Sequence, residues 1–372
     1  MSFKTTHTGS LPRPDDLLKL MFAREGGEAV DEGKLDEAIE RATAHVVERQ
    51  KHAGITVMGD GEMSKPSYAT YIKHRLSGFG GEVGQYEFQD LEEFPGAKAQ
   101  VFGNKGRSKR SAPACTAPIA VIDMEAPRQD AERLQRLAGG HETFMSAASP
   151  GVTALFFPNK YYASDEEYVF ALAEGLRHEY ETVAAAGITL QVDCPDLAMG
   201  RHVQFTDLSL EDFRKRIGMN IAALNHALQG IPAEQLRMHL CWGNYPGPHH
   251  CDVPLAEIAD IVWEARPRTV LLEGANPRHG HEFAYFEENP LPDGKVLCPG
   301  MVEPQSPYIE HPDLIAQRIS RYADLLGRER VMAGVDCGFS VHAGSNSLDP
   351  EIVWAKLAAL AEGAEIASRR YW

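Results

Sequence analysis

The chain has 372 residues, 43% of them hydrophobic and 24% charged, so it is long enough to bury a large core. Its 53 acidic residues outnumber 37 Lys and Arg, and the net charge of −16 argues against a protein that binds nucleic-acid phosphates. The N-terminus lacks the apolar run of a secretory signal and no stretch approaches a membrane span, so we expect a cytoplasmic protein whose six cysteines are thiols.

Short apolar runs alternate with amphipathic helical stretches along the chain. The predicted strands are Thr5–Ser10, Ile55–Asp60, Glu142–Ala147, Ile188–Asp193, Leu236–Cys241, Thr269–Glu273, Lys295–Pro299 and Val331–Val335. The predicted helices are Leu35–Ala53, Glu166–Ala186, Leu210–Leu228, Leu255–Ala265, Pro312–Leu326 and Pro350–Ala367.

This alternation predicts an α/β protein with a (β/α)8 barrel, formed by residues 1–372 as a single domain. An open doubly wound sheet is the alternative, but no glycine-rich fingerprint follows the first strand. Residues from about 79 to 120 interrupt the pattern. There Tyr86–Gln89 and Ala99–Phe102 predict a β-hairpin or a small antiparallel excursion inserted into the second βα unit.

Polar side chains are concentrated where the predicted strands end. In a barrel of this kind the active site lies at the C-terminal ends of the strands and in the loops that follow. The residues at these positions are Ser10, Asp60, Glu62, Asp193, His239, Cys241, Glu273, Asp336 and Cys337. The sequence therefore predicts a catalytic face at this rim.

His239 and Cys241 are the strongest local signal for a metal. They are two residues apart on a strand and so share a face, and imidazole with thiolate is a natural zinc pair. Alone, such a pair is a weak signal that more often reflects ordinary packing. Glu273 places a carboxylate directly after a buried run, and Cys337 places a second thiol at the end of the last strand. Four N, S and O donors can thus meet at the mouth of a closed barrel.

With these motifs the chain resembles the catalytic domain of cobalamin-independent methionine synthase and its single-barrel relatives, over nearly its whole length. The resemblance is carried by Thr6-His7-Thr8-Gly9-Ser10-Leu11-Pro12, Gly59-Asp60-Gly61-Glu62, Leu190-Gln191-Val192-Asp193-Cys194-Pro195, His239-Leu240-Cys241, Leu272-Glu273 and Asp336-Cys337-Gly338. It implies a Zn²⁺ cofactor held by His239, Cys241, Glu273 and Cys337. It also implies that Glu62 and Asp193 hold the amino group of homocysteine and that Ser10 lines its carboxylate.

The chemistry implied is activation of a small thiol. A free thiol has a pKa near ~8.5, and coordination to zinc deprotonates it near neutral pH. Four protein ligands normally make a closed structural site, so one must yield for catalysis. The resemblance suggests that the oxygen of Glu273 gives way to the incoming sulfur.

Two segments depart from the synthase pattern. Gln305 stands where the synthases carry a histidine thought to assist proton transfer, and glutamine cannot titrate. Phe156 and Phe157 stand in the segment where the synthases have a tryptophan that stacks on folate. A folate donor is therefore not assured, and neither is a proton-transfer role for Gln305.

Other residues near the predicted site have a structural interpretation, and some also have a functional one. Trp242 is predicted to wall the substrate pocket, although an aromatic after a strand is more often core. His279 and His281 are a second metal pair or, more simply, loop residues that shape the pocket. His249 and His250 are read as its rim, and Cys194, Cys251 and Cys298 as packed thiols.

Three functions remain open. The first is a zinc-dependent S-alkyltransferase that methylates a homocysteine-like thiol, with a small thiol and a small alkyl donor as partners. The second is opening of an epoxide by a zinc thiolate, as in epoxyalkane:coenzyme M transferases, where a sulfonate would need a cation. The third is a non-catalytic barrel with a structural zinc. A homo-oligomer is left open. The cations available for a sulfonate are Arg13, Lys65, Arg107 and Arg201.

Overall fold

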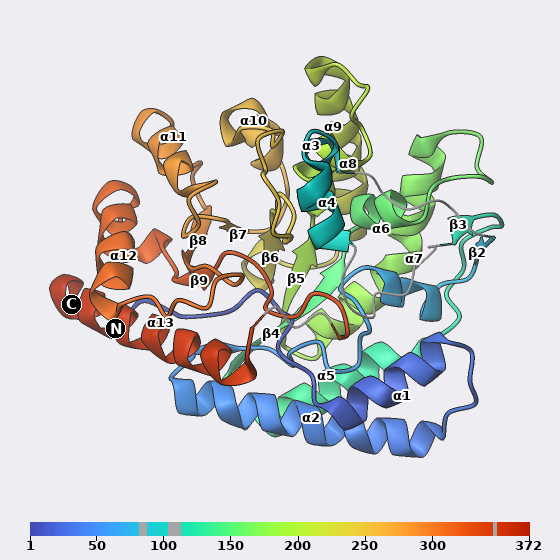
Figure 1. The fold of residues 1–372 in the computed structure, drawn as a ribbon, viewed down its shortest axis with the longest axis horizontal. Coiled ribbons are helices and arrows are strands. Elements are labelled where there is room, and N and C mark those ends of the chain that lie inside the picture. Colours follow the sequence, from blue (N-terminus) through green and yellow to red (C-terminus); the bar gives the residue numbers. More distant parts are fainter. Residues whose placement is uncertain (82–87, 103–112, 345–347) are drawn as a thin grey trace.

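A curled parallel sheet forms the centre of the molecule (Figure 1). The computed structural model describes residues 1–81, 88–102, 113–344 and 348–372, without the side chains of Gln100 and Phe102. Within these ranges seven strands pair in parallel in chain order. They are β1 (Val57–Met58), β4 (Glu142–Ala148), β5 (Thr189–Asp193), β6 (Leu236–His239), β7 (Thr269–Leu272), β8 (Val296–Val302) and β9 (Gly334–Val335).

The two edges of this sheet are joined by the N-terminal segment. Thr5 forms a parallel bridge to Ala333, next to β9, and Thr6 forms one to Val57 on β1. The backbone N–H of Thr6 donates to the carbonyl of Ala333 at 3.0 Å, and that of Val57 donates to Thr5 at 3.0 Å. The predicted first strand therefore occupies its expected place, as two bridges rather than a ladder, and the other seven predicted strands are confirmed.

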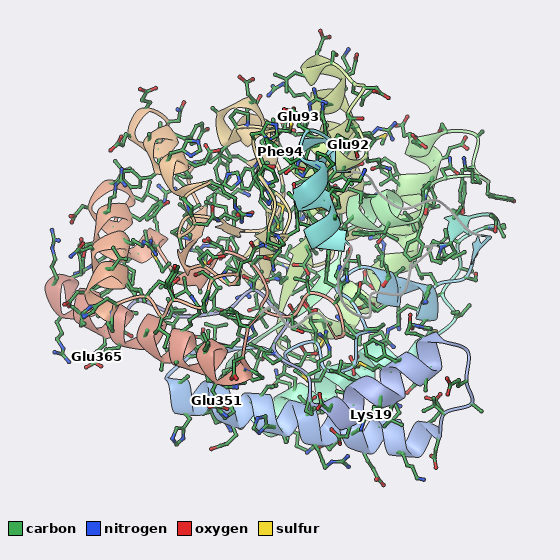
Figure 2. All side chains as sticks on the ribbon, in the orientation of Figure 1. Lys19, Glu92, Glu93, Phe94, Glu351 and Glu365 are labelled. Atoms are coloured by element: carbon green, nitrogen blue, oxygen red, sulfur yellow. The ribbon has the colours of Figure 1, made fainter. Side chains whose placement is uncertain are left out.

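Long helices surround the sheet (Figure 1). Their starts and ends follow capping residues: the Ser209 side chain accepts from the N–H of Asp212 at the start of α9, and α2 ends at Gly54, with a φ of 80°. The helices that match predictions are α2 (Glu32–Ala53), α7 (Asp165–Ala185), α9 (Leu210–Ala227), α12 (Pro312–Leu326) and α13 (Pro350–Tyr371). The charged side chains of Glu351 and Glu365 extend from the outer face of α13 (Figure 2).

Other helices differ from the prediction. The predicted helix Leu255–Ala265 is broken into a 3-10 turn, Leu255–Glu257, and α10 (Ala259–Val262). The helices α1 (Asp15–Glu25), α5 (Glu125–Ala138), α6 (Pro150–Phe156), α8 (Gly200–Val203) and α11 (Phe283–Glu288) were not predicted.

The insertion after β1 is not the predicted hairpin. The short strands β2 (Phe79–Gly80) and β3 (Ala114–Cys115) pair antiparallel, but the segment between them contains α3 (Gln89–Glu92) and α4 (Pro95–Phe102). The prediction of a strand over Ala99–Phe102 is therefore wrong. Pro95 starts α4 with a preset φ, and the alanines that follow favour helix. Tyr86 and Glu87 lie outside the described residues.

A buried arginine crosses the interior of the sheet. Arg237 on β6 donates from Nε to Gln191 at 2.8 Å, from Nη1 to Thr6 Oγ1 at 2.9 Å and from Nη2 to the carbonyl of His7 at 2.8 Å. These partners come from β5 and from the N-terminal segment that joins the edges of the sheet. Arg237 therefore ties two distant parts of the curled sheet together through its centre.

Candidate metal centre

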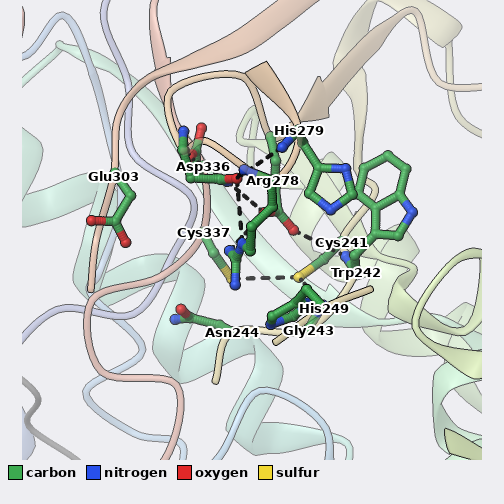
Figure 3. Close-up of polar contacts among 12 residues, drawn as sticks. Cys241, Trp242, Gly243, Asn244, His249, Arg278, His279, Glu303, Asp336 and Cys337 are labelled. Atoms are coloured by element: carbon green, nitrogen blue, oxygen red, sulfur yellow. Dashed lines mark hydrogen bonds and ion pairs between the residues drawn. The ribbon is translucent and has the colours of Figure 1, made fainter. Parts of the chain in front are cut away.

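The ends of three strands of the sheet, β6, β7 and β9, supply the predicted metal ligands. His239 ends β6, with Cys241 two residues on, while Glu273 directly follows β7 and Cys337 lies two residues after β9. Parallel strands bring their carboxyl ends to one rim, and all four side chains are buried there. Figure 3 shows Cys241 and Cys337 facing each other across this rim.

Three of the four predicted ligands meet. A nitrogen of His239 and the Sγ atoms of Cys241 and Cys337 all lie within 4.8 Å of one another, and the two Sγ atoms are 3.7 Å apart. The Cys337 sulfur first, and then burial, raises the pKa of the Cys241 thiol well above its usual value. Two thiolates this close would repel each other in a buried site, and a soft divalent cation removes that repulsion. The residues present therefore fit a bound metal.

Glu273 lies beside this group, where other residues hold its carboxylate by hydrogen bonds. Its Oε1 accepts from the backbone N–H of Trp242 at 3.1 Å. Its Oε2 accepts from Asn276 Nδ2 at 2.7 Å and from Arg278 Nη2 at 2.9 Å. The structure therefore does not bring Glu273 into the three-residue group: its oxygens face protein donors next to it, and its role as a fourth ligand stays a prediction.

Asp336, next to Cys337, organises the loop that carries Glu273 and Arg278. Its Oδ1 accepts from the backbone N–H groups of Gly274 and Ala275, both at 2.8 Å, and its Oδ2 accepts from Asn276 N and Nδ2 at 2.8 and 2.7 Å. Burial raises the pKa of Asp336 to about 6, and the charge of Glu273 adds to this. Asp336 stands among the rim residues in the sequence, but its role in holding the loop was not predicted.

Close packing around Asp336 leads to a stability prediction. A Cβ on Gly300, in β8, would lie 1.8 Å from Asp336 Oδ1 and 2.7 Å from its backbone nitrogen, so we expect Gly300→Ala to displace the loop and lower the free energy of unfolding by ~3 kcal/mol or more. Gly218, in α9, has no atom near its Cβ position, so Gly218→Ala should raise it by ~1 kcal/mol. Urea denaturation of both variants measures this, and equal stability of the two would contradict it.

Glu62 and Asp193 come together on the same rim. The Oε1 of Glu62 accepts from Ser146 Oγ at 2.9 Å, whereas its buried Oε2 has no hydrogen-bond partner among the described residues and lies 3.8 Å from Arg13 Nη2. Burial, and then the charge of Asp193, raises the pKa of Glu62 to about 7. Asp193 Oδ1 lies 3.6 Å from His239 Nδ1. Asp193 therefore stands next to the three-residue group and Glu62 acts electrostatically on Asp193, while the binding of an amino group by this pair stays a prediction.

The backbone at Glu62 is strained. Its φ is 59°, in the left-handed region that residues with a side chain seldom adopt. Its backbone N–H donates to Asp60 Oδ1 at 2.9 Å, which fixes this turn. Gly9 lies against the carboxyl group, since a Cβ there would be 2.4 Å from Glu62 Oε1. A side chain held in this way at a strand end is typical of a functional position.

Ser10 and Gln305 reach the site from opposite sides. Ser10 Oγ accepts from the backbone N–H of Ser340 at 3.3 Å, in the loop that follows Cys337. Gln305 Nε2 donates to Asn244 Oδ1 at 2.7 Å, and Asn244 Nδ2 donates to the carbonyl of Gly338 at 2.7 Å. Both predicted residues thus lie around the loop that carries Cys337.

Trp242 has the environment of a core residue. Its side chain is fully buried, its Nε1 donates to the carbonyl of Val253 at 2.6 Å, and its ring stacks on His279 at 4.2 Å. This environment favours the core interpretation, and contact between Trp242 and a substrate stays a prediction.

Three histidines converge on Asp252 behind the metal centre. His249 Nδ1 and His279 Nε2 each lie 2.9 Å from Asp252 Oδ2, and His202 Nδ1 lies 3.2 Å from Oδ1. Burial opposes protonation of His279, but hydrogen bonds to Asp252 and Glu282 prevail and raise its pKa to about 9. The sequence separates these histidines widely, and only the spacing of His249 and Asp252, three residues apart, could have signalled the cluster.

The cations considered for a sulfonate are largely committed to other partners. Arg13 is buried and donates to the carbonyls of Ser340, Glu62 and Lys65. Lys65 Nζ donates to the carbonyl of Ser146, and Arg201 Nη1 donates to that of Phe205. Arg107 lies outside the described residues.

The remaining predicted residues fall in several places. Phe157 is buried against Phe79, while Phe156 is partly exposed beside Tyr68. Cys194 and Cys298 are buried thiols, as predicted. The partly exposed Cys251 instead forms a second, surface group of metal-binding type with Glu93 and His250. His281 is exposed and, unlike His279, is outside the cluster around Asp252.

In the described ranges no helix combines the length and apolar character that crossing a membrane requires.

The sequence of this chain is similar to those of known enzymes. The family profile described as cobalamin-independent synthase, catalytic domain, matches residues 3–350. The methionine synthase of Thermococcus kodakarensis is 26% identical over 368 residues, which cover 98% of this chain and 93% of that protein. The 2-hydroxypropyl-CoM lyase of Xanthobacter autotrophicus is 24% identical over 98% of this chain and 95% of its own.

Solved structures share the fold. A B12-independent methionine synthase from a Shewanella species, in complex with selenomethionine, superposes with a TM-score of 0.76 at 18% identity, covering 100% of this chain and 99% of that one. A second, described as a putative vitamin-B12 independent methionine synthase from Listeria monocytogenes, gives 0.67 at 19% identity over 100% and 98%. With the family profile spanning almost the whole sequence, the chain belongs to the family of cobalamin-independent synthase catalytic domains.

Proposed function

We propose that this enzyme is a zinc-dependent thiol S-alkyltransferase that methylates a homocysteine-like thiol. The observation that carries the proposal is the buried meeting of His239, Cys241 and Cys337 beside a carboxylate, Glu273, that is hydrogen-bonded to Arg278. We further propose that residues 1–372 form one (β/α)8 catalytic domain, with Thr5 and Thr6 in the place of the first strand.

The four predicted residues would hold the metal, and their chemistry suits zinc. Two sulfurs and an imidazole are ligands that zinc prefers, and a carboxylate oxygen completes the set. Zinc, when bound, supplies the positive charge that lowers the pKa of a substrate thiol to near neutrality.

The surrounding residues suit an amino-acid thiol. Glu62 and Asp193 can accept hydrogen bonds from an ammonium group, and the unpartnered Oε2 of Glu62 is free to do so. Ser10, beside the loop that follows Cys337, is placed to line the acid end of the substrate. Gln305 can position a group through Asn244 but cannot supply a proton. In the overall reaction the new bond joins sulfur to the methyl carbon, and the bond from that carbon to the donor breaks.

Epoxide opening is a second candidate. The similarity to the 2-hydroxypropyl-CoM lyase is nearly as high as that to the synthases and covers as much of the chain. Against it, Arg13 and Lys65 are committed to backbone carbonyls, and their side chains are almost fully buried.

A matrix of substrates tests the proposal. The zinc-loaded enzyme is incubated with homocysteine or coenzyme M, each with methyltetrahydrofolate or epoxypropane, and thioether formation is measured by mass spectrometry. We expect methionine from homocysteine and the methyl donor, loss of that activity after chelation, and its return with zinc but not with magnesium. Turnover of epoxypropane with coenzyme M and none with homocysteine would establish the second candidate instead.

A further inference from the structure

We propose that Arg278 is a positioning residue that receives the Glu273 carboxylate when a substrate sulfur takes its place on the metal. The inference rests on the proposed function and assigns a role to a residue that the sequence did not single out. It concerns how the fourth ligand position opens.

Both oxygens of Glu273 have hydrogen-bond partners outside the group formed by His239, Cys241 and Cys337. Only 1% of its side chain is exposed, and both of its oxygens accept hydrogen bonds from the protein. A buried carboxylate without such partners would be strongly destabilised once it left a cation. The pair with Arg278, at 2.9 Å between Nη2 and Oε2, supplies the compensating charge.

Arg278 is held in place by hydrogen bonds to residues other than Glu273. Its backbone N–H and its Nε both donate to Asn276 Oδ1, at 2.9 and 3.3 Å, and its Nη1 lies 3.5 Å from the carbonyl of Tyr245. Asn276 in turn is fixed by Asp336. The guanidinium therefore stays at the same place whether or not Glu273 is paired with it.

The place of Glu273 beside Arg278 is also next to the group formed by His239, Cys241 and Cys337. Its Oε1 bonds to the N–H of Trp242, the residue that follows Cys241, and its charge acts on the Cys241 thiol. The carboxylate would therefore have a cation on either side, Arg278 or a metal held by His239, Cys241 and Cys337. A thiol that bound the metal would displace the carboxylate toward Arg278.

The test uses the full-length protein loaded with cobalt(II) in place of zinc. Sulfur-to-cobalt absorption bands report thiol uptake directly, without any alkyl donor. The variants are Arg278→Ala, Arg278→Lys and the control Arg266→Ala, which changes a partly buried arginine that bonds to the carbonyl of Ile231. Each is titrated with L-homocysteine and with uncharged 2-mercaptoethanol.

We expect Arg278→Ala to raise the dissociation constants of both thiols by about tenfold or more while the metal stays bound, because Glu273 then has no cation to move to. Arg278→Lys should recover part of the affinity, and Arg266→Ala should match the unaltered protein. An Arg278→Ala protein with unchanged thiol affinities would overturn the inference. So would a loss confined to homocysteine, since that would make Arg278 a binding residue for the substrate carboxylate.

If the proposed function is wrong, the thiol titration of the cobalt protein gives a different result. In that case the unaltered cobalt protein would show no new sulfur band with either thiol, or would not bind the metal at all. Both the proposed function and the role of Arg278 would then be rejected together.

Discussion

Replacing Cys241 with serine is expected to release the metal and abolish alkyl transfer while leaving the protein folded. Structural zinc sites bind with about 10–16 kcal/mol, so one ligand of four is worth roughly 2.5–4 kcal/mol, or about 10²–10³-fold in the dissociation constant. Cys337→Ser should have the same effect, since the two Sγ atoms lie 3.7 Å apart and serve one group. Metal content by mass spectrometry and chelator competition measures the loss.

The matched control is Cys298→Ala, which removes another buried thiol, from β8, outside the ligand group. It should keep its metal and its activity and lose only the stability that a small cavity costs, ~1 kcal/mol. Circular dichroism decides between a catalytic and a structural metal. If Cys241→Ser and Cys337→Ser unfold together with metal loss, the non-catalytic barrel with a structural zinc becomes the better interpretation.

Much of the fold was predictable because it follows local periodicity. The apolar run Val270–Leu272 is buried on both faces, and such a run gives the same signal whatever lies around it. The insertion was mispredicted for the opposite reason. Alternating apolar residues over 99–102 suggest a strand, but a helix starting at Pro95 includes them.

The site was predictable where ligands end strands and not where partners come from distant loops. His239 and Cys241 are recognisable by their spacing, and a barrel brings Glu273 and Cys337 to the same rim. The methyltransferase prediction is supported at the level of the family. No spacing in the sequence links Arg278 to Glu273 through Asn276, and none gathers His202 and His279 around Asp252. Such contacts depend on how each loop folds back over the rim.

The Glu62→Gln variant is expected to lose recognition of the substrate amino group. Removing one partner of a buried charged pair costs about 2–5 kcal/mol, so kcat/KM for homocysteine should fall by about 10²-fold or more, mostly through KM. The analogue 4-mercaptobutanoate has no amino group, and the variant should use it as well as the unaltered enzyme does. Asp193→Asn is less informative, because Asp193 also lies 3.6 Å from His239 Nδ1.

A pH profile gives this prediction a second measurement. Burial and the charge of Asp193 raise the pKa of Glu62 to about 7, and only the ionised carboxylate can pair with an ammonium group. The kcat/KM for homocysteine should therefore be constant above pH 7 and fall tenfold per unit below it. The inflection should disappear in Glu62→Gln. It should persist in the control Asp196→Asn, which alters another buried carboxyl whose pKa is raised, to about 6, but which bonds to Ser149 and Asn220.

We propose that Glu62 and Asp193 are kept close together because an incoming ammonium group is shared between them. Glu62 adopts a strained φ of 59°, and among the described residues one of its buried oxygens has no hydrogen-bond partner, an arrangement that is unfavourable in the free protein. If Glu62→Gln left the preference for homocysteine over 4-mercaptobutanoate unchanged, that arrangement would have another purpose, and the acceptor would be a thiol without an amino group.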